Sequence, residues 1–391
     1  MRIVLTGGGT GGHIMPFESI VEALRSTFTE KQSTFPGFTD PELLEIYFLG
    51  IVTAEATEFF NRYQVPTYNI PSGKMRRYAS AMNILDIAFR LPLGIVIALI
   101  QMWKIMPDVV VSKGGYASMP VCIAAIIYRI PILLHESDVV PGSSNAFVMR
   151  FAAAITLGFA VSRQYLQQYE KKLFVTGTPT RTLISDDRKK ESKQEFGIPA
   201  EEHVLLVMGG SQGAQQINDA LIASLPELIG NMTIIHITGE AHHVAIEKVS
   251  QEFLAKSPRK DMYKSFPTLK GAKMTQALMA SDSAVTRAGA SSLAEIASLR
   301  IPSLIIPLDG AANDHQRKNA LAFEAAGAAL VLDPTNVSPH LLTQEVERLI
   351  TDQQLRTAII ENIKALDFPH AALDIATLAL ELASGYLPSK K

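Results

Sequence analysis

The 391-residue sequence has little cysteine and almost no net charge, and each shortage excludes a class of protein. A single cysteine, Cys122, excludes an intrachain disulfide; it lies in an apolar run and is expected in the core of a protein from a reducing compartment. A formal net charge of −2 gives the whole molecule no electrostatic preference for nucleic acid. The apolar run before the first glycines is too short for a signal peptide. We therefore expect a cytoplasmic protein that binds no nucleic acid.

Several metal and phosphate motifs are also missing. The sequence contains no Asp-x-Asp and no His-x-x-x-His, and no Gly-Lys-Ser/Thr follows its glycine loops. The first two spacings are typical of metal sites and the third of phosphate-binding Walker loops. We therefore expect no cofactor and no obligatory metal.

The length and composition indicate two globular domains, because 391 residues exceed what one hydrophobic core usually supports. Short β-branched runs alternate with segments of helical apolar spacing, such as 16–28 and 214–228. The predicted strands are residues 3–6, 46–49, 109–112, 132–135 and 154–157, then, after a loop near residue 177, 203–208, 233–238, 284–286, 303–306 and 329–332. This alternation and its restart predict two α/β units with parallel sheets. The polar stretch 185–193 is expected to be a solvated helix with no further role.

The most apolar segment covers residues 91–106. Its uncharged stretch is shorter than the roughly 20 apolar residues that a membrane-spanning helix needs, and Pro92 and Gly94 interrupt its start. Two interpretations stay open: a buried helix, or an interfacial patch that touches an anionic membrane leaflet. The flanking residues that suit the second interpretation are Lys74, Arg76, Arg77, Arg90, Trp103 and Lys104.

Three glycine turns each follow a predicted strand, at residues 7–13 (GGGTGGH), 113–120 (KGGYASMP) and 209–214 (GGSQGA). Glycines let a backbone approach its ligand closely and expose N–H groups where negative charge is favoured. A nicotinamide dehydrogenase is disfavoured, because Gly50 stands where a ribose-binding acid would end the second strand. Three such turns in two α/β units predict a binding cleft between the domains.

Six ordered segments resemble the MurG family of peptidoglycan N-acetylglucosaminyltransferases. They are residues 7–13, 114–118 (GGYAS), 135–145 (HESDVVPGSSN), 209–214, 287–295 (RAGASSLAE) and 314–320 (DHQRKNA), within a match that runs from residue 3 to about residue 330. The resemblance implies the α/β fold called GT-B, in which two Rossmann-like, doubly wound domains face a cleft. Residues 1–175, joined by a C-terminal helix over 371–391, would bind the acceptor and the membrane, and residues 176–370 would bind the donor.

The resemblance also implies the reaction. N-acetylglucosamine would pass, with inversion, from UDP-N-acetylglucosamine to lipid I (undecaprenyl-pyrophosphoryl-N-acetylmuramyl-pentapeptide), forming lipid II for peptidoglycan synthesis, cell shape and cell division. The protein would be peripheral on the inner face of the cell membrane, held through the basic and apolar patch around residues 74–106.

The residues implied for the donor include Glu295, whose carboxylate suits the two hydroxyls of a ribose because it accepts two hydrogen bonds. The whole donor set is Thr10, Gly11, Gly12, Arg181, Gly210, Ser211, Gln212, Gly213, Arg287, Glu295, His315, Gln316 and Asn319. Helix N-terminal amides and Arg181 would stabilise the leaving pyrophosphate.

The residues implied for the acceptor are His13, Gly115, Tyr116, His135 and Asn145. Inversion needs a base that takes the proton of the attacking muramyl hydroxyl. His13 is the first candidate, since an imidazole accepts a proton near neutral pH. Its rivals are His135, Glu136 and Asp138, the last at a position where many relatives have Asn.

Other functions on this architecture are glycosylation of a diacylglycerol lipid, UDP-sugar 2-epimerisation, and non-catalytic binding of a nucleotide sugar. The segment 135–145 favours the muramyl acceptor, because it belongs to the acceptor half of the pattern. A non-catalytic subunit is disfavoured because His13, Glu295 and Gln316 are all present.

Overall fold

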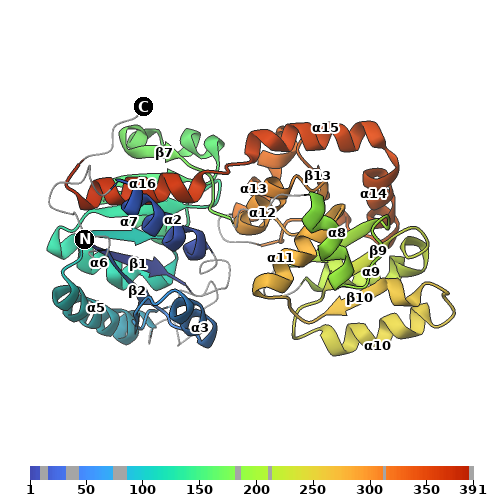
Figure 1. Ribbon diagram of the computed structural model, residues 1–391, viewed down its shortest axis with the longest axis horizontal. Helices are drawn as coiled ribbons and strands as arrows, with labels where there is room; N and C mark the ends of the chain where they lie inside the picture. The colour runs from blue at the N-terminus through green and yellow to red at the C-terminus, as the bar shows by residue number, and fades with distance from the viewer. Residues whose placement is uncertain are drawn as a thin grey trace. The chain divides into compact units, whose positions relative to one another are not determined.

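The computed structural model describes residues 1–8, 16–31, 44–73, 86–180, 186–209, 214–310 and 314–386. The chain divides into two compact units (Figure 1). The first is Met1–Arg181 with Phe368–Lys391, and the second is Thr182–Asp367.

The first unit is built on a seven-stranded sheet in the order β3-β2-β1-β4-β5-β6-β7, with every pairing parallel. Its strands are β1 (Arg2–Gly7), β2 (Glu45–Gly50), β3 (Thr67–Asn69), β4 (Val109–Ser112), β5 (Ile132–Glu136), β6 (Ala154–Leu157) and β7 (Leu173–Val175). Alternate residues of β1 enter different cores, Leu5 on one face and Val4 on the other. Both faces are therefore covered, as a parallel sheet requires.

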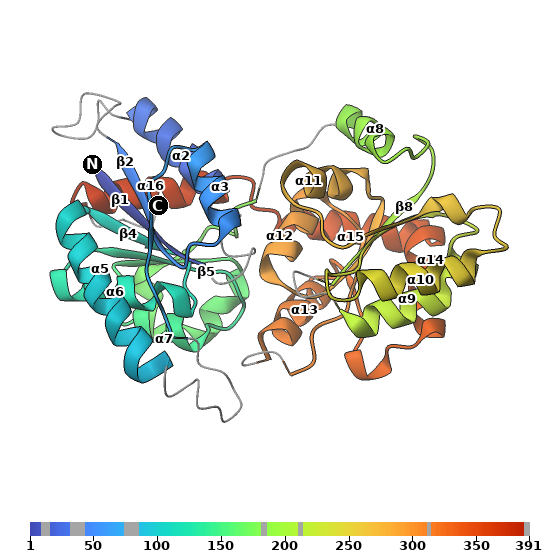
Figure 2. The same cartoon turned by 90° about the horizontal axis from the view of Figure 1, so that it is seen from below.

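Two groups of helices cover these faces. On the Leu5 face lie α2 (Pro16–Lys31), α3 (Ala54–Arg62) and α16 (Ala371–Ala383). On the Val4 face lie α5 (Leu91–Ile105), α6 (Met119–Tyr128) and α7 (Ser143–Val148), seen together in Figure 2. The last helix, α16, runs beside α2 (Figure 1), so the chain ends in the unit where it began.

The second unit repeats the plan with a six-stranded parallel sheet, in the order β10-β9-β8-β11-β12-β13. Its strands are β8 (Val204–Met208), β9 (Thr233–Ile237), β10 (Tyr263–Phe266), β11 (Ser283–Thr286), β12 (Ser303–Ile305) and β13 (Leu330–Val331). Its helices are α8 (Asp186–Glu195), α9 (Gln215–Leu228), α10 (His243–Leu254), α11 (Gly271–Ala280), α12 (Ala290–Leu299), α13 (His315–Ala325), α14 (Pro339–Thr351) and α15 (Gln353–Ile363).

The expectation of two doubly wound parallel sheets is confirmed. Three strands were not predicted: β3, β7 and β10. Each lies at the edge of its sheet and is largely half-buried. The sequences of β3 and β10 have no continuous apolar run, and the apolar run of β7 is only three residues long, so all three carry a weak signal.

The chain leaves the first unit a few residues later than expected, because residues after β7 still bond to β6. The amides of Thr176 and Gly177 both donate to the carbonyl of Leu157, at 3.2 and 3.0 Å. Gly177 has a φ of 75°, and a Cβ there would lie 2.2 Å from Cβ of Phe368. The segment that follows β7 and the segment that precedes α16 are thus in contact at Gly177, where a residue with a Cβ would not fit.

The helical segment here begins earlier than expected, because the π-helical turn Asp86–Arg90 runs directly into the apolar helix α5. By length and composition alone, Ala88–Ile105 is the one candidate for a membrane-spanning helix in the part of the chain described. It is nevertheless packed on one side. A Cβ on Gly94 would lie 1.9 Å from the carbonyl oxygen of Pro71, and Met102 belongs to the core.

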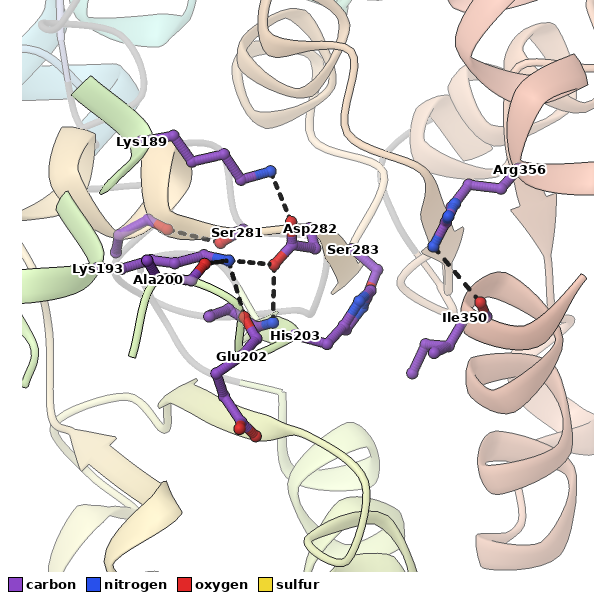
Figure 3. A network of polar contacts seen from close by, with 12 residues as sticks. Lys189, Lys193, Ala200, Glu202, His203, Ser281, Asp282, Ser283, Ile350 and Arg356 are labelled. Atoms are coloured by element: carbon purple, nitrogen blue, oxygen red, sulfur yellow. Dashed lines mark hydrogen bonds and ion pairs between the residues drawn. The ribbon is translucent and has the colours of Figure 1, made fainter. Parts of the chain in front are cut away.

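The polar helix α8 is anchored, contrary to the expectation of a merely solvated helix (Figure 3). Asp282, just before β11, contacts Nζ of Lys189 at 2.6 Å and Nζ of Lys193 at 3.0 Å. The same carboxylate accepts from the backbone amide of Val204 at 2.9 Å. One aspartate therefore joins α8 to the amino ends of β8 and β11.

Candidate active site

Both sheets reverse their strand order beside their first strand, between β1 and β4 in one unit and between β8 and β11 in the other. In open parallel sheets, ligands bind outside the carboxyl ends of the strands at such a reversal. The turns after β4 and β11, and the residues that end β5, lie at these ends. Each unit therefore offers one candidate binding edge.

The turn after β4 has a backbone that favours glycine. Gly114 and Gly115 have φ angles of 82° and 79°, in the left-handed region. A Cβ on Gly114 would lie 2.0 Å from Oδ1 of Asn145. The amide of Gly115 donates to that oxygen at 3.3 Å, and Ser72 Oγ donates to the carbonyl of Tyr116 at 2.6 Å. The structure thus brings the predicted Gly115, Tyr116 and Asn145 together.

Glu136, which ends β5, is a buried carboxyl group held by two donors. Its Oε1 accepts from the amide of Asp138 at 3.0 Å, and its Oε2 accepts from Nδ2 of Asn145 at 2.8 Å. Burial and the negative charge of Asp138 raise the pKa of Glu136 to about 8, although both hydrogen bonds and Lys113 lower it. Burial therefore favours the protonated form of Glu136 more than it would for an exposed carboxyl group. Of the two predicted carboxyl groups, Asp138 is the accessible one, being only half-buried.

His135 is enclosed, which argues against the expected direct contact with an acceptor. Its side chain is 1% exposed, and Nδ1 lies 3.0 Å from Oγ1 of Thr156. Nε2 is buried and has no hydrogen-bond partner among the described residues. Burial, with the positive charge of Lys113, holds the pKa of His135 well below its ordinary value. The low pKa favours a neutral ring, enclosed at the end of β5.

Lys113 is a charged residue at this edge that the motifs did not single out. It lies between β4 and Gly114, is 3% exposed, and donates from Nζ to Oγ of Ser137 at 2.8 Å. The sequence carried no local signal for it, because lysines are usually exposed and the burial of this one depends on contacts with residues far away in the chain, such as Ser137.

In the second unit, Arg287 directly follows β11 and is half-buried. Its Nε is buried without a hydrogen-bond partner within the described ranges, and burial lowers the pKa of its guanidinium. A buried N–H is costly unless it meets an acceptor, and a guanidinium pairs well with phosphate. The position therefore suits an anionic ligand.

The remaining donor candidates lie on two helices that follow. Glu295 is half-buried on α12, and His315 begins α13. Oε1 of Gln316 accepts from the amide of Leu308 at 2.9 Å. These three keep enough exposure to meet a ligand.

Asn319 plays a different part, because it has no exposed surface. Its Nδ2 donates to the carbonyl of Ala288 at 3.0 Å, next to Arg287. It fastens α13 to the turn after β11 and so supports this edge.

Part of the predicted site lies outside the described residues. These are His13, the first candidate base, with Thr10, Gly11, Gly12, Arg181, Gly210, Ser211, Gln212 and Gly213. Among the residues that are described, no group of three or more His, Cys, Asp or Glu side chains is arranged to hold a metal ion.

Two family models match the chain, one in each half. The glycosyltransferase family 28 N-terminal domain matches residues 44–157, and the glycosyltransferase family 28 C-terminal domain matches residues 204–373. The two matches include the candidate edges of both units.

Curated relatives match nearly the whole chain. It is 32% identical to a Bacillus thuringiensis (strain Al Hakam) protein named UDP-N-acetylglucosamine--N-acetylmuramyl-(pentapeptide) pyrophosphoryl-undecaprenol N-acetylglucosamine transferase 3, over 89% of this chain and 91% of that one. A Legionella pneumophila (strain Paris) protein with this name, without the number, is 30% identical over 99% of this chain and 98% of its own.

Solved structures share the fold. A crystal structure of Acinetobacter baumannii MurG matches with a TM-score of 0.69 and 22% identity, covering 97% of this chain and 99% of that one. A Neisseria meningitidis UDP-GlcNAc 2-epimerase bound to UDP-GlcNAc matches with a TM-score of 0.68 and 15% identity, covering 97% and 100%. At these identities the likeness shows the GT-B-like architecture alone.

Proposed function

Because this chain belongs to the MurG-type enzymes of glycosyltransferase family 28, we propose that it transfers N-acetylglucosamine from UDP-N-acetylglucosamine to lipid I, forming lipid II for peptidoglycan synthesis. The observation that carries this proposal is the near full-length similarity to transferases of that name, at 32% and 30% identity. The epimerases of similar fold are only about half as similar in sequence, at 15% identity for the Neisseria enzyme.

The donor is assigned to the second unit. The unpartnered Nε of Arg287 supports this, because a phosphate oxygen would satisfy it. Glu295 would accept hydrogen bonds from the ribose hydroxyls, and His315 and Gln316 would contact the sugar. Arg181 and the amides of residues 210–213, outside the described ranges, complete the predicted phosphate site.

The acceptor and the base are assigned to the first unit. The muramyl hydroxyl oxygen forms a bond to C1 of the sugar while the bond from C1 to the UDP oxygen breaks, so the configuration inverts. The hydroxyl proton passes to a base, and UDP leaves with the electron pair of the broken bond. Among the described candidates Asp138 suits this role best, because it is only half-buried while Glu136 and His135 are enclosed, and burial raises the pKa of Glu136. His13 stays the alternative base.

We also propose that the enzyme is peripheral on the cytoplasmic face of the membrane. Helices α5, α6 and α7 cover the same face of the first sheet, and together they expose large apolar side chains. This α5–α7 surface consists of Phe89, Leu93, Val96, Ile100, Trp103, Met106, Ile127, Tyr128, Phe147 and Phe151.

Basic residues border the same surface. Arg90, Lys104, Arg129 and Arg150 are exposed at the ends of its helices. Apolar side chains beside cations suit an anionic leaflet, where a lipid-linked acceptor would be met. The inner side of α5 packs in the core, which favours contact with the surface of the bilayer over a span.

Transfer of labelled N-acetylglucosamine to a short-chain lipid I analogue, in EDTA, tests the proposed function. We expect product from the wild-type protein and none above background from Glu295→Ala. Asp138→Asn and His13→Ala, assayed in parallel, separate the two candidate bases, since the base variant loses turnover but still binds donor. Conversion of UDP-N-acetylglucosamine to its 2-epimer without any transfer would instead identify an epimerase.

A further inference from the structure

Lys113 occupies the point where the strand order of the first sheet reverses. Its backbone amide donates to the carbonyl of Thr6 at 2.9 Å, so it extends the pairing of β1 with β4. A Cβ on Gly7 would lie 3.2 Å from Cβ of Lys113, so the two chains are in close contact there. The lysine is thereby fixed beside the turn that carries Gly115 and Tyr116.

The Lys113 ammonium faces the groups that end β5 and follow it. Its Nζ donates to Oγ of Ser137 at 2.8 Å. The titratable groups that interact with it are His135 and Glu136 on β5 and Asp138 in the following loop. In the described part of the chain it is the one cation in this cluster, beside two carboxyl groups.

The surroundings of Lys113 do not favour a purely structural role. Burial lowers the pKa of Lys113 to about 8, while Asp138 and Glu136 raise it. A buried charge carries a large desolvation cost, and an apolar side chain of similar size would often stabilise such a position as well or better. A lysine here is therefore better explained by its charge.

We propose that Lys113 is a positioning residue for the transfer reaction: it fixes the turn from Glu136 to Asp138 through Ser137 and supplies the positive charge that lets one of these two carboxyl groups stay ionised beside the other. Without that charge, two neighbouring carboxyl groups favour each other's protonated form. This inference rests on the proposed function, because it assigns the acceptor hydroxyl to the same edge.

The test compares Lys113→Met, which keeps the side-chain length and removes the charge, with Ser137→Ala, which removes the hydrogen-bond acceptor and keeps the charge. The readouts are the pH profile of transfer to a lipid I analogue and the binding of UDP-N-acetylglucosamine. For Lys113→Met we expect the acidic limb of kcat/KM to move up by about one pH unit and turnover at pH 7 to fall about tenfold or more. Donor binding should stay within about twofold, because Lys113 lies in the first unit and most of the predicted donor residues lie in the second. Ser137→Ala should keep the acidic limb of the wild type.

The outcomes distinguish a positioning role of Lys113 from a purely structural role. If Lys113→Met transfers more slowly but with an unmoved acidic limb, Lys113 is only structural and the inference is wrong. If Lys113→Met does not fold, Lys113→Arg and Ser137→Ala replace it. Both retain the charge, so we expect an unmoved acidic limb in both, and a moved acidic limb in either would overturn the inference. If the wild type transfers nothing to lipid I, the proposed function fails first and this inference falls with it.

Discussion

Asn145 Nδ2 donates to Glu136 Oε2 over 2.8 Å, and through this bond helix α7 holds the carboxyl group that ends β5. Oδ1 of the same side chain accepts a hydrogen bond from the backbone amide of Gly115. One side chain thus links two of the sequence motifs, the turn at 114–118 and the segment 135–145, and within the second it ties the start of α7 to the end of β5.

Replacing Asn145 with alanine should impair acceptor transfer more than donor binding. The change leaves the buried carboxyl of Glu136 and the amide of Gly115 without this partner. Such a loss costs about 1–3 kcal/mol of unfolding free energy, and we expect transfer to fall about tenfold or more because the turn is no longer held. Transfer assays and urea unfolding measure the two effects. Ser143→Ala, an exposed serine of α7, is the matched control. Transfer by Asn145→Ala at the wild-type rate would show that the link is not needed.

Replacing Trp103 with alanine should weaken binding to anionic vesicles. Its side chain is 69% exposed at the end of α5, where it would enter the interface of the bilayer. We expect the affinity for phosphatidylglycerol vesicles to fall about tenfold, from the apolar area that no longer leaves water. Flotation with labelled vesicles measures this. Phe253→Ala removes an aromatic side chain that is 48% exposed on α10 of the other unit, and it should change nothing. Equal losses in both variants would argue against a specific α5–α7 surface.

Replacing Asp282 with alanine should destabilise the second unit. The buried Nζ of Lys193 would lose its carboxylate, and the amide of Val204 would lose an acceptor (Figure 3). Leaving a buried charge unpaired is strongly destabilising, by about 3–5 kcal/mol, although two carbonyl oxygens still bond Lys193 and place the expected loss at the lower end. Urea unfolding measures the loss. Asp261→Ala, an exposed aspartate of the same unit, should cost less than about 0.5 kcal/mol. A loss of that size in Asp282→Ala as well would show that the anchor of α8 is weak.

His236 should make the stability of the second unit depend on pH. Its ring is fully buried, with Nδ1 at 2.8 Å from the hydroxyl of Tyr263 and Nε2 at 2.9 Å from Oδ1 of Asn218. Burial lowers the pKa of His236 to about 3. Between the ordinary histidine pKa near 6.5 and this value, the unfolded chain binds a proton that the folded chain does not. The contribution is complete above about pH 6.5 and is lost as the pH falls, with a slope of up to about 1.4 kcal/mol per pH unit.

The measurement is urea unfolding at a series of pH values between 4 and 8. His236→Gln should remove this part of the slope even if it lowers stability at every pH. His340→Gln replaces an exposed histidine of the same unit and should leave the slope unchanged. An unchanged slope in His236→Gln would mean that another group carries the pH dependence.

Much of the fold could be predicted because the buried strands have short, mostly apolar sequences that are easy to recognise. Runs such as 109–112 and 154–157 are mostly apolar and every residue in them is buried, since helices cover both faces of their sheet, and their predicted bounds match the observed ones. The edge strands β3, β7 and β10 were missed, because β3 and β10 contain polar residues and the apolar run of β7 is only three residues long. The glycine turn at 114–115 was found from its sequence, and its positive φ angles give the reason for glycine there.

The sequence by itself determined which residues gather at the edges of the two sheets, because strand ends and glycine turns are local features. Only the tertiary structure decided what each side chain does there. His135 and Glu136 are neighbours in one motif, yet packing of β5 against β6 encloses the ring, and Asn145 and Asp138 hold the carboxyl. Lys113 joined them through a contact with Ser137, 24 residues away, that no local pattern shows. Burial and pKa depend on such contacts, because they are set by everything that surrounds a group and not by its neighbours in the chain.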